Sequence, residues 1–554
     1  MSGTTDNVSE RSPLLRRASE APVLDDNDQQ DDSKGISTPR AVSCIAGLGV
    51  LIMLQATNIS LMTVTQSAIA SDLDAFEEAS WFTSAYLIAM SSAAPINGKL
   101  AQILSPRISI FISTIILAFG TLFTAFTADF RGFVIGRAIT GAGAAGIFTV
   151  AVIIVLDLAT PKQRGLLIGV MNMLMTVGVS AGATVAGALL PLTGWRPLFW
   201  MQSPIALVGG VFLLFCIPKS FGTKTKQASN DSMLKRLAGQ DYLGAATLTL
   251  GIVLMLLAVS SPTKIPITPI IASLIILVIF VLIEIYIASE PIIPVSLLRS
   301  RGLFFTCAGT VGYMMSRWTI LFYTPTYAIA VRGWSPATGG AILIPTNAGF
   351  AMGGLLVGWL HIRRDGSFYF PALITYILFP ITFLVLSLTS SATSSPVLYV
   401  FLVFCNGFIT GASLNYTFAH LLHLTPKSTH FMATSLIATF RGFAGSFASA
   451  AGGGYFVRVL REALNHGFAD RAIQPRDGLI RRLLGSPALV QTLEGAEKDV
   501  AVEGYTTALR ALWLGAAVLA AVIIFLQAST GWTAPREAKE EEEAADVETR
   551  RQSH

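Results

Sequence analysis

The chain has 554 residues, of which 53% are hydrophobic and only 13% are charged. An ordinary soluble domain carries about twice that share of charged residues, so the composition argues against a protein that folds in water alone. The formal net charge of +5 does not indicate a nucleic-acid partner, because the basic residues gather in short segments between apolar runs. The four cysteines lie inside apolar runs and predict no disulfide framework.

The apolar residues fall into runs of about twenty, each long enough to cross a hydrocarbon core of about 30 Å. We predict an all-α polytopic membrane protein with about fourteen spans, or thirteen on a stricter reading. The expected helices cover residues 41–66, 79–98, 108–128, 133–156, 166–191, 198–217, 242–260, 267–288, 303–325, 337–360, 369–389, 396–420, 431–455 and 507–528.

These helices predict a division of the chain into two bundles and their connections. A polar, disordered cytoplasmic tail is expected at residues 1–40 and an acidic cytoplasmic tail at 529–554. The remaining parts are an N-terminal six-helix bundle at 41–217, a cytoplasmic loop at 218–240, two linking helices at 241–288, and a C-terminal bundle at 303–528 with a long non-cytoplasmic loop near 456–506. With the N-terminus inside, the predicted inner loops are rich in Lys and Arg, as the positive-inside rule requires. The first outer loop is acidic, with Asp72, Asp74, Glu77 and Glu78.

The turn after the second predicted helix carries a recognisable motif. Gly98, Lys99, Leu100, Ala101 and Arg107 resemble the loop between helices 2 and 3 of the Major Facilitator Superfamily, whose usual form is Gly-x-Leu-Ala-Asp-x-x-Gly-Arg. The resemblance implies two pseudo-symmetric six-helix bundles and a gating role for this loop. Gln102 replaces the aspartate that latches the two halves in that family, and Arg107 is also consistent with a snorkelling interfacial anchor.

Small residues surround an arginine in the fourth predicted helix. Gly136, Arg137, Gly141 and Gly143 resemble the family's fourth-helix motif, in which the arginine is buried. An arginine at the bilayer centre costs at least about 2.5 kcal/mol, so Arg137 should face protein or a watery cavity unless it snorkels to an interface.

The fifth predicted helix resembles the antiporter motif of the superfamily at Gly178, Gly182 and Gly187, although Ala183 and Ala186 replace a proline and a glycine. Antiport and simple close packing of two helix backbones both account for these glycines.

Two further stretches resemble the fourteen-span drug and proton antiporter branch. The first comprises Gly194, Trp195, Arg196, Phe199 and Pro204, and the second runs from Gly333 to Gly349. The resemblance covers about residues 41 to 455. The branch includes fungal vacuolar basic amino acid transporters and fungal multidrug or toxin exporters, and these motifs do not choose between them.

One departure from the branch concerns proton coupling. Members often begin helix 1 with Leu-Asp-x-Thr-Ile, whereas Gln55 occupies the acidic position here. An amide can hydrogen-bond a solute but does not titrate, so coupling needs another group. Asp157 and Glu284 are the proton-coupling candidates, and both are also consistent with interfacial positions.

Polar residues inside apolar runs mark a candidate substrate pathway, because polar groups in hydrocarbon need partners or water. Helix-to-helix hydrogen bonds are the alternative role, and an arginine facing a cavity can hold a carboxylate. The candidates are Gln55, Asn58, Arg137, Arg317, Asn347 and Arg441.

The polar N-terminal tail contains one addressing signal. Glu10, Leu14 and Leu15 resemble the acidic dileucine signal that endosomal and vacuolar sorting adaptors read. The signal favours the vacuolar membrane, with the plasma membrane as the alternative.

The sequence therefore predicts a secondary active transporter, proton-coupled, that moves small solutes such as basic amino acids into the vacuole. Plasma-membrane efflux of drugs, toxins or secondary metabolites is the alternative, and a non-transporting solute receptor is the alternative of another class. An ATP-driven pump and an enzyme are not expected, because neither a Gly-x-x-x-x-Gly-Lys-Ser/Thr loop nor a His-Glu-x-x-His motif occurs. The expected partners are the solute, protons, membrane lipids and a sorting adaptor, with no cofactor, metal or nucleic acid.

Overall fold

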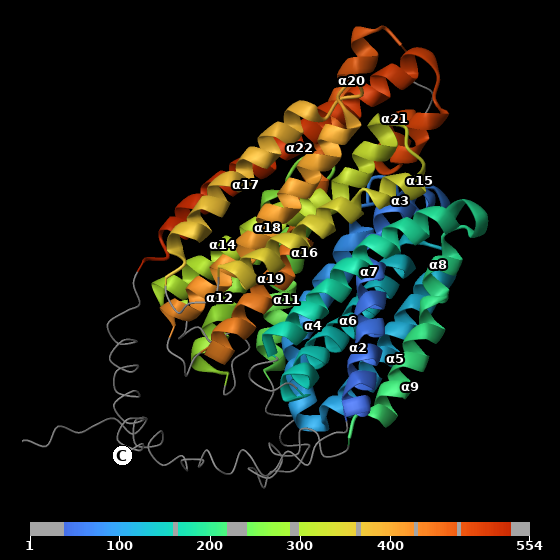
Figure 1. The fold of residues 1–554 in the computed structure, drawn as a ribbon. Coiled ribbons are helices and arrows are strands. Elements are labelled where there is room, and N and C mark those ends of the chain that lie inside the picture. Colours follow the sequence, from blue (N-terminus) through green and yellow to red (C-terminus); the bar gives the residue numbers. More distant parts are fainter. Residues whose placement is uncertain are drawn as a thin grey trace, which may run out of the picture.

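The computed structural model describes residues 38–158, 164–218, 241–288, 298–361, 367–425, 430–473 and 478–532, and these ranges contain helices but no strand. Eleven of the described helices are long and apolar enough to cross a membrane. Three more helices, α4, α14 and α19, have 24, 26 and 18 residues and lie among them in the same bundle (Figure 1). The described helices are therefore consistent with the fourteen predicted spans.

The N-terminal half consists of six spans and one short helix. The spans are α2 (Thr38–Ser60), α4 (Trp81–Leu104), α5 (Pro106–Phe126), α6 (Phe130–Leu158), α7 (Arg164–Thr193) and the broken pair α8 (Arg196–Trp200) and α9 (Gln202–Cys216), with α3 (Met62–Asp72) following α2. Two linking helices, α11 (Tyr242–Val259) and α12 (Ile267–Tyr286), pack on each other.

The C-terminal half has the same number of spans and an additional cap. Its elements are α14 (Arg301–Thr326), η1 (Tyr327–Val331), α15 (Pro336–Ala341), α16 (Leu343–Leu360), α17 (Tyr369–Thr389), α18 (Pro396–Leu424), α19 (His430–Phe447), η3 (Ala448–Gly452), α20 (Gly453–Asp470), α21 (Leu479–Gly485), η4 (Pro487–Thr492) and α22 (Gly495–Ala528).

The two halves repeat one pattern of helix pairing. In the N-terminal half α2 packs on α7, α4 on α6, and α5 on both α6 and α9. The corresponding pairs of the C-terminal half are α14 with α19, α16 with α18, and α17 with both α18 and α22. The halves meet where α7 packs on α15 and α16, and where α4 packs on α19. This repetition is the pseudo-symmetry expected for a transporter built from two six-helix units.

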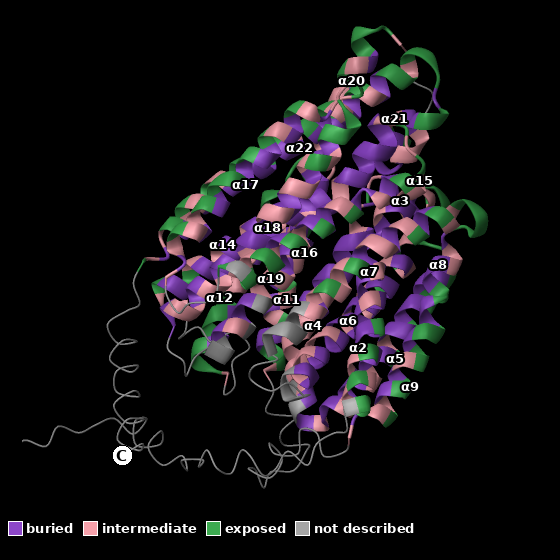
Figure 2. Ribbon diagram, in the orientation of Figure 1, coloured by how far each residue is buried: buried purple, intermediate pink, exposed green. Residues whose placement is uncertain are grey.

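The molecule has two distinct ends. We call the end that holds α3, α20 and α21 the cap pole, and the end where α2 begins and α22 finishes the tail pole (Figure 1). Buried residues line the contacts between helices and exposed residues face outward (Figure 2). Large apolar side chains such as Phe119, Phe215, Leu388 and Phe525 lie on the exposed faces, as the hydrocarbon core of a bilayer requires.

Several predicted helix limits are wrong. The second helix was expected to end at residue 98, but α4 continues to Leu104. The first span was expected to reach residue 66, but α2 ends at Ser60 and α3 begins at Met62. The last span was expected from 507, but α22 begins at Gly495, and most of the predicted loop at 456–506 is helical in α20, α21, η4 and α22. The first turns of α22 carry Glu497, Lys498 and Asp499, so hydropathy reads this extramembrane extension of the helix as loop.

Candidate functional site

A buried polar cluster holds the N-terminal half together near the cap pole. Arg137 on α6 is fully buried and donates from Nε to the Phe82 carbonyl oxygen on α4 at 2.8 Å. Its two Nη atoms donate to the side-chain and backbone oxygens of Asn58 on α2, and its guanidinium lies 4.6 Å from the Tyr86 ring centroid. Asn58 in turn donates to Gln202 on α9 at 2.7 Å. Arg137 is therefore buried in protein and does not snorkel to an interface.

Gln55 lies one turn below this cluster on α2. Only 2% of the residue is exposed, and its amide nitrogen contacts the Met90 sulfur of α4 at 3.4 Å. The Gln55 side-chain oxygen is buried and has no hydrogen-bond partner among the described residues. The amide that replaces the family's frequent acid thus faces the N-terminal half, with one acceptor unused.

A second polar cluster connects the two halves. Arg317 on α14 is buried and donates to the Thr346 hydroxyl and, at 3.1 Å, to the Asn347 side-chain oxygen, both on α16. The Asn347 amide then donates to the Ser180 hydroxyl on α7 at 2.9 Å. A chain of hydrogen bonds therefore runs from the interior of the C-terminal half into the N-terminal half.

Arg441 completes the set of interior arginines, and its surroundings differ. It lies on α19 next to Gly442, whose carbonyl oxygen accepts a hydrogen bond from Ser91 of α4 at 2.7 Å. Arg441 is half-buried and interacts electrostatically with Tyr313 of α14, but no hydrogen bond joins it to a described residue. Arg441 therefore lies at the junction of the halves with a guanidinium that no described acceptor satisfies.

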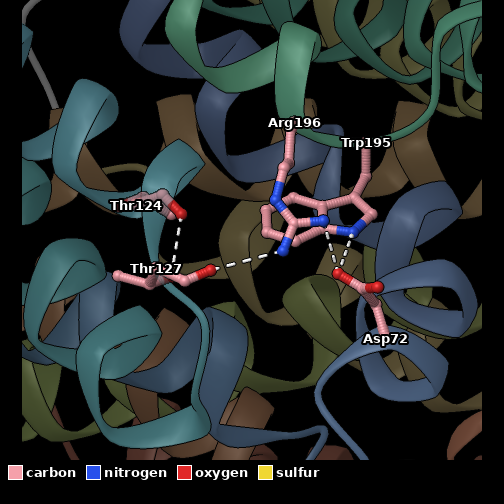
Figure 3. A network of polar contacts seen from close by, with 5 residues as sticks. All are labelled: Asp72, Thr124, Thr127, Trp195 and Arg196. Carbon is pink, nitrogen blue, oxygen red and sulfur yellow. Dashed lines mark hydrogen bonds and ion pairs between the residues drawn. The ribbon is translucent and has the colours of Figure 1, made fainter.

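The cap-pole end of α3 is fastened to the N-terminal half by Asp72. Figure 3 shows Arg196 and Trp195 converging on one carboxylate oxygen of Asp72, at 2.6 Å and 3.2 Å. Arg196 also donates to the Thr127 carbonyl oxygen at 3.4 Å. Trp195 and Arg196 of the Gly-Trp-Arg motif thus join the connection before α8 to the end of α3 and to the connection between α5 and α6.

The next acids of the same segment pair with the opposite half. Asp74 accepts a hydrogen bond from Arg481 of α21 at 2.8 Å, and Glu77 accepts one from Arg461 of α20 at 2.9 Å. The hydrogen bond to Asp74 raises the pKa of Arg481 above its usual value. Because that value is already far above neutral, Arg481 stays charged and pairs with Asp74 throughout the physiological range.

A cavity of about 290 Å³ lies beneath this cap. Thr63 and Gln66 line it from α3, Thr326 and Pro336 from the C-terminal half, and Ser486 and Leu489 from the start of η4 and from η4 itself. Its walls thus come from both halves and the cap, and the lining holds no charged side chain.

The antiporter-like glycines are packing positions in this conformation. A Cβ on Gly178 would lie 2.7 Å from the Met53 carbonyl oxygen of α2, and one on Gly182 2.7 Å from the Thr57 Cα. A Cβ on Gly187 would instead lie 2.5 Å from the Pro336 carbonyl oxygen of the C-terminal half. A Cβ on Gly340 of that half would lie 2.5 Å from the Ala183 carbonyl oxygen of α7. Two glycines therefore fit α7 against α2, and two more close the junction of the halves at the cap pole.

The other candidate residues are not brought together. Gly98 ends up in the last turns of α4, while half-buried Arg107 begins α5 beyond Ser105, whose φ is 115°. Glu284 is buried near the tail-pole end of α12, outside the two six-helix units. The side chains of Lys99 and Asp157, and residues Glu10, Leu14 and Leu15, lie outside the described part of the chain. No group of three or more His, Cys, Asp or Glu residues within the described ranges could hold a metal ion.

Sequence reasoning missed the functional partners of the acidic outer loop. The sequence shows Asp74 and Glu77 in an acidic outer loop, and Arg461 and Arg481 lie within the long non-cytoplasmic loop predicted near 456–506. The opposite charges of these two extramembrane segments were the available signal, although 384 and 407 residues separate the partners.

Comparison with known proteins agrees with this architecture. The family model of the Major Facilitator Superfamily matches residues 46–449. This chain belongs to the Major Facilitator Superfamily. An MFS transporter of Phoma sp. is 25% identical over 87% of this chain and 80% of its own length, and a multidrug resistance protein of Schizosaccharomyces pombe is 23% identical over 82% and 86%.

Among solved structures, a bacterial homologue of the human lysosomal transporter Spinster, inward-facing and unoccupied, superposes with a TM-score of 0.60 at 12% identity, covering 89% of this chain and 98% of the other. At that identity the likeness shows the fold alone. The MFS family and the apolar helices together make this chain an integral membrane transporter with the all-α MFS fold, and not an enzyme.

Proposed function

We propose that this MFS transporter exports a small organic metabolite or toxin by alternating access. The observation that carries the proposal is the combination of a closed cap pole with polar groups of both halves meeting deeper in the bundle. Ion pairs from Arg461 and Arg481 and the Gly187 and Gly340 contacts hold the cap pole shut. A solute between the halves can reach that side only after these contacts part, which is the defining step of alternating access.

The charge of the interior favours a metabolite over a basic amino acid. Arg137, Arg317 and Arg441 place cationic groups in the interior of the halves, whereas the acids on the described spans, apart from those in the first turns of α22 at the cap pole, are Asp157 and Glu284. A lysine or arginine solute needs a carboxylate for its side-chain cation, and like charges within a low-dielectric site repel. The relatives whose names mention multidrug resistance and efflux point the same way. We therefore favour efflux over vacuolar amino acid uptake, and the plasma membrane over the vacuole.

Proton coupling is part of the proposal and depends on those two acids. Gln55 cannot carry a proton, so Asp157 or Glu284 must do so if a gradient drives transport. A proton that moves inward in exchange for the exported solute contributes about 2.3 kcal/mol per 100 mV. Asp157→Asn and Glu284→Gln separate the two: the variant that removes the carrier should lose gradient-driven transport and keep solute exchange at equal pH.

The experiment compares cells that produce the protein with cells that carry an empty vector. Metabolites are profiled inside and outside the cells, and labelled lysine, arginine and histidine uptake is measured in sealed vacuolar vesicles from both. Depletion of specific metabolites inside producing cells, with their appearance outside, supports export. Gradient-dependent amino acid uptake that requires the protein would overturn it in favour of the vacuolar assignment. Solute binding by the purified protein without movement in either assay would identify a receptor.

A further inference from the structure

In the C-terminal half, the helices from α14 to α19 carry two interior arginines and no acidic residue. Between Pro291 and Arg461 the sequence contains one acidic residue, Asp365, and it lies in the connection before α17 rather than on a span. Arg317 and Arg441 lie within the spans of the same half. A charged side chain inside a membrane protein requires a partner or water, and the described helices from α14 to α19 offer these two arginines no carboxylate.

The two arginines differ in how far the protein satisfies them. Arg317 uses its donors on Thr346 and Asn347, so its guanidinium is held by neutral oxygens. Among the described residues, Arg441 has an electrostatic interaction with Tyr313 and no hydrogen bond. Tyr313 donates its own hydroxyl hydrogen to the Thr410 carbonyl oxygen and remains neutral, so it balances neither arginine. Of the two arginines, Arg441 is therefore the one whose guanidinium N–H groups lack acceptors among the described residues.

The position of Arg441 suits a solute that enters between the halves. It lies eleven residues after His430, or about 16 Å along α19, in the second half of that helix. Its neighbour Gly442 contacts Ser91 of the N-terminal half, while Arg441 itself is only half-buried. Its partly accessible side chain belongs to a helix that packs on both α4 of the N-terminal half and α14 of the C-terminal half.

An aromatic surface lies beside it. Trp318 and Phe322 of α14 are stacked at 5.5 Å and are only partly buried. A Cβ on Gly445, one turn beyond Arg441, would come within 3.3 Å of Trp318. A cation next to partly buried rings offers one anchor for a negative group and one for an apolar body, which is the usual composition of a small-molecule site.

We propose that Arg441, supported by the charge of Arg317, binds the acidic group of an organic anion whose aromatic body packs on Trp318. The inference rests on the proposed export function and names its substrate class. The planar guanidinium can donate two parallel hydrogen bonds to a carboxylate, and lysine cannot reproduce that geometry.

The test uses three probes with one ring system and different charge: 2-naphthoate, 2-naphthamide and 2-naphthylmethylammonium. Binding to the full-length protein in lipid nanodiscs is measured by titration calorimetry, and movement by efflux from proteoliposomes loaded with each probe. The variants are Arg441→Gln, Arg441→Lys and, as a matched removal of one positive charge, Lys264→Gln in the exposed connection between α11 and α12.

We expect the carboxylate to bind at least tenfold more tightly than the amide or the cation. Arg441→Gln should abolish that preference, Arg441→Lys should restore only part of it, and Lys264→Gln should leave it unchanged. Carboxylate binding no tighter than amide binding overturns the inference, as does a preference that survives in Arg441→Gln. Efflux of the amide without carboxylate preference leaves export standing while the anion site fails. Selective carboxylate binding without efflux of any probe would contradict the proposed export function and still support the anion-binding site.

Discussion

The two halves hold their interior arginines in opposite ways. In the N-terminal half Arg137 is fully buried, and the oxygens of Asn58 and Phe82 accept from its guanidinium. In the C-terminal half Arg317 is satisfied by α16, but Arg441 lies half-buried at the junction without a described acceptor. A guanidinium with a complete set of neutral partners stabilises a helix bundle, whereas a partly accessible one with unused donors can still accept a ligand.

Replacing each arginine by glutamine gives the largest expected contrast. Arg137→Gln leaves several buried oxygens without donors, and we expect a loss of about 3 kcal/mol or more in stability, or failure of the protein to accumulate. Arg441→Gln removes an unbalanced charge and should unfold at the same temperature as the wild type or higher. Thermal unfolding of the purified proteins measures both, with Lys264→Gln as control. Wild-type stability of Arg137→Gln together with lost transport would move Arg137 into the solute pathway.

The glycines at the contacts of α7, Gly178 on α7 and Gly340 on α15, extend the contrast between the halves from charge to packing. Gly178 fits α7 against α2 within one half, whereas Gly340 fits the other half against Ala183 of α7. We expect Gly178→Val to destabilise the fold, because the valine would clash with the Met53 backbone of α2, and α2 belongs to the same half as α7. Gly340→Val should leave the unfolding temperature within a few degrees, since the halves can part, but lower efflux at least tenfold because the cap pole no longer closes. Equal loss of stability in both variants would contradict the division into two moving halves.

The hydrogen bond between Asn347 and Ser180 joins the Arg317 cluster to the opposite half. Asn347→Ala, Ser180→Ala and the double variant form a thermodynamic cycle on unfolding and on efflux rate. We expect a coupling of about 0.5–1.5 kcal/mol, the usual contribution of one hydrogen bond, and a change in efflux of about threefold to tenfold. Additive effects of the two single variants would mean that the contact does not link the halves energetically.

The cap ion pair between Arg461 and Glu77 should have the smallest effect. Both side chains are 29% exposed, and such pairs usually contribute about 0.2–1 kcal/mol. Arg461→Gln and Glu77→Gln should each raise the fraction of molecules open at the cap pole, detected as faster labelling of a cysteine introduced at Thr63, by no more than about fivefold. As the salt concentration rises, the labelling rate of the wild type should approach that of the variants, because salt screens the ion pair. Slower labelling in either variant would argue that the pair holds the cap open.

Helix positions followed closely from the sequence, because membrane spans reveal themselves through local hydropathy. The predicted limits 242–260 and 369–389 match α11 (Tyr242–Val259) and α17 (Tyr369–Thr389) to within one residue. Local hydropathy failed at α20 and α22, where charged turns of helix extend past the apolar core. The glycine motif was recognised from the sequence. That Gly178 packs on α2 of the same half while Gly187 packs on Pro336 of the opposite half could not be predicted without knowing which helices are neighbours.

By itself the sequence determined that this chain crosses the membrane many times, that it resembles the MFS, and that it places arginines among apolar residues. These are properties of composition and of spacing along one helix, where a few neighbouring residues decide the outcome. Only the tertiary structure decided which arginine is satisfied and which is not, because the acceptors for Arg137 and Arg317 come from other helices, 55 and 29 residues or more away. Hydrogen bonds form over about 3 Å, so their existence depends on the packing of helices and not on their order in the chain.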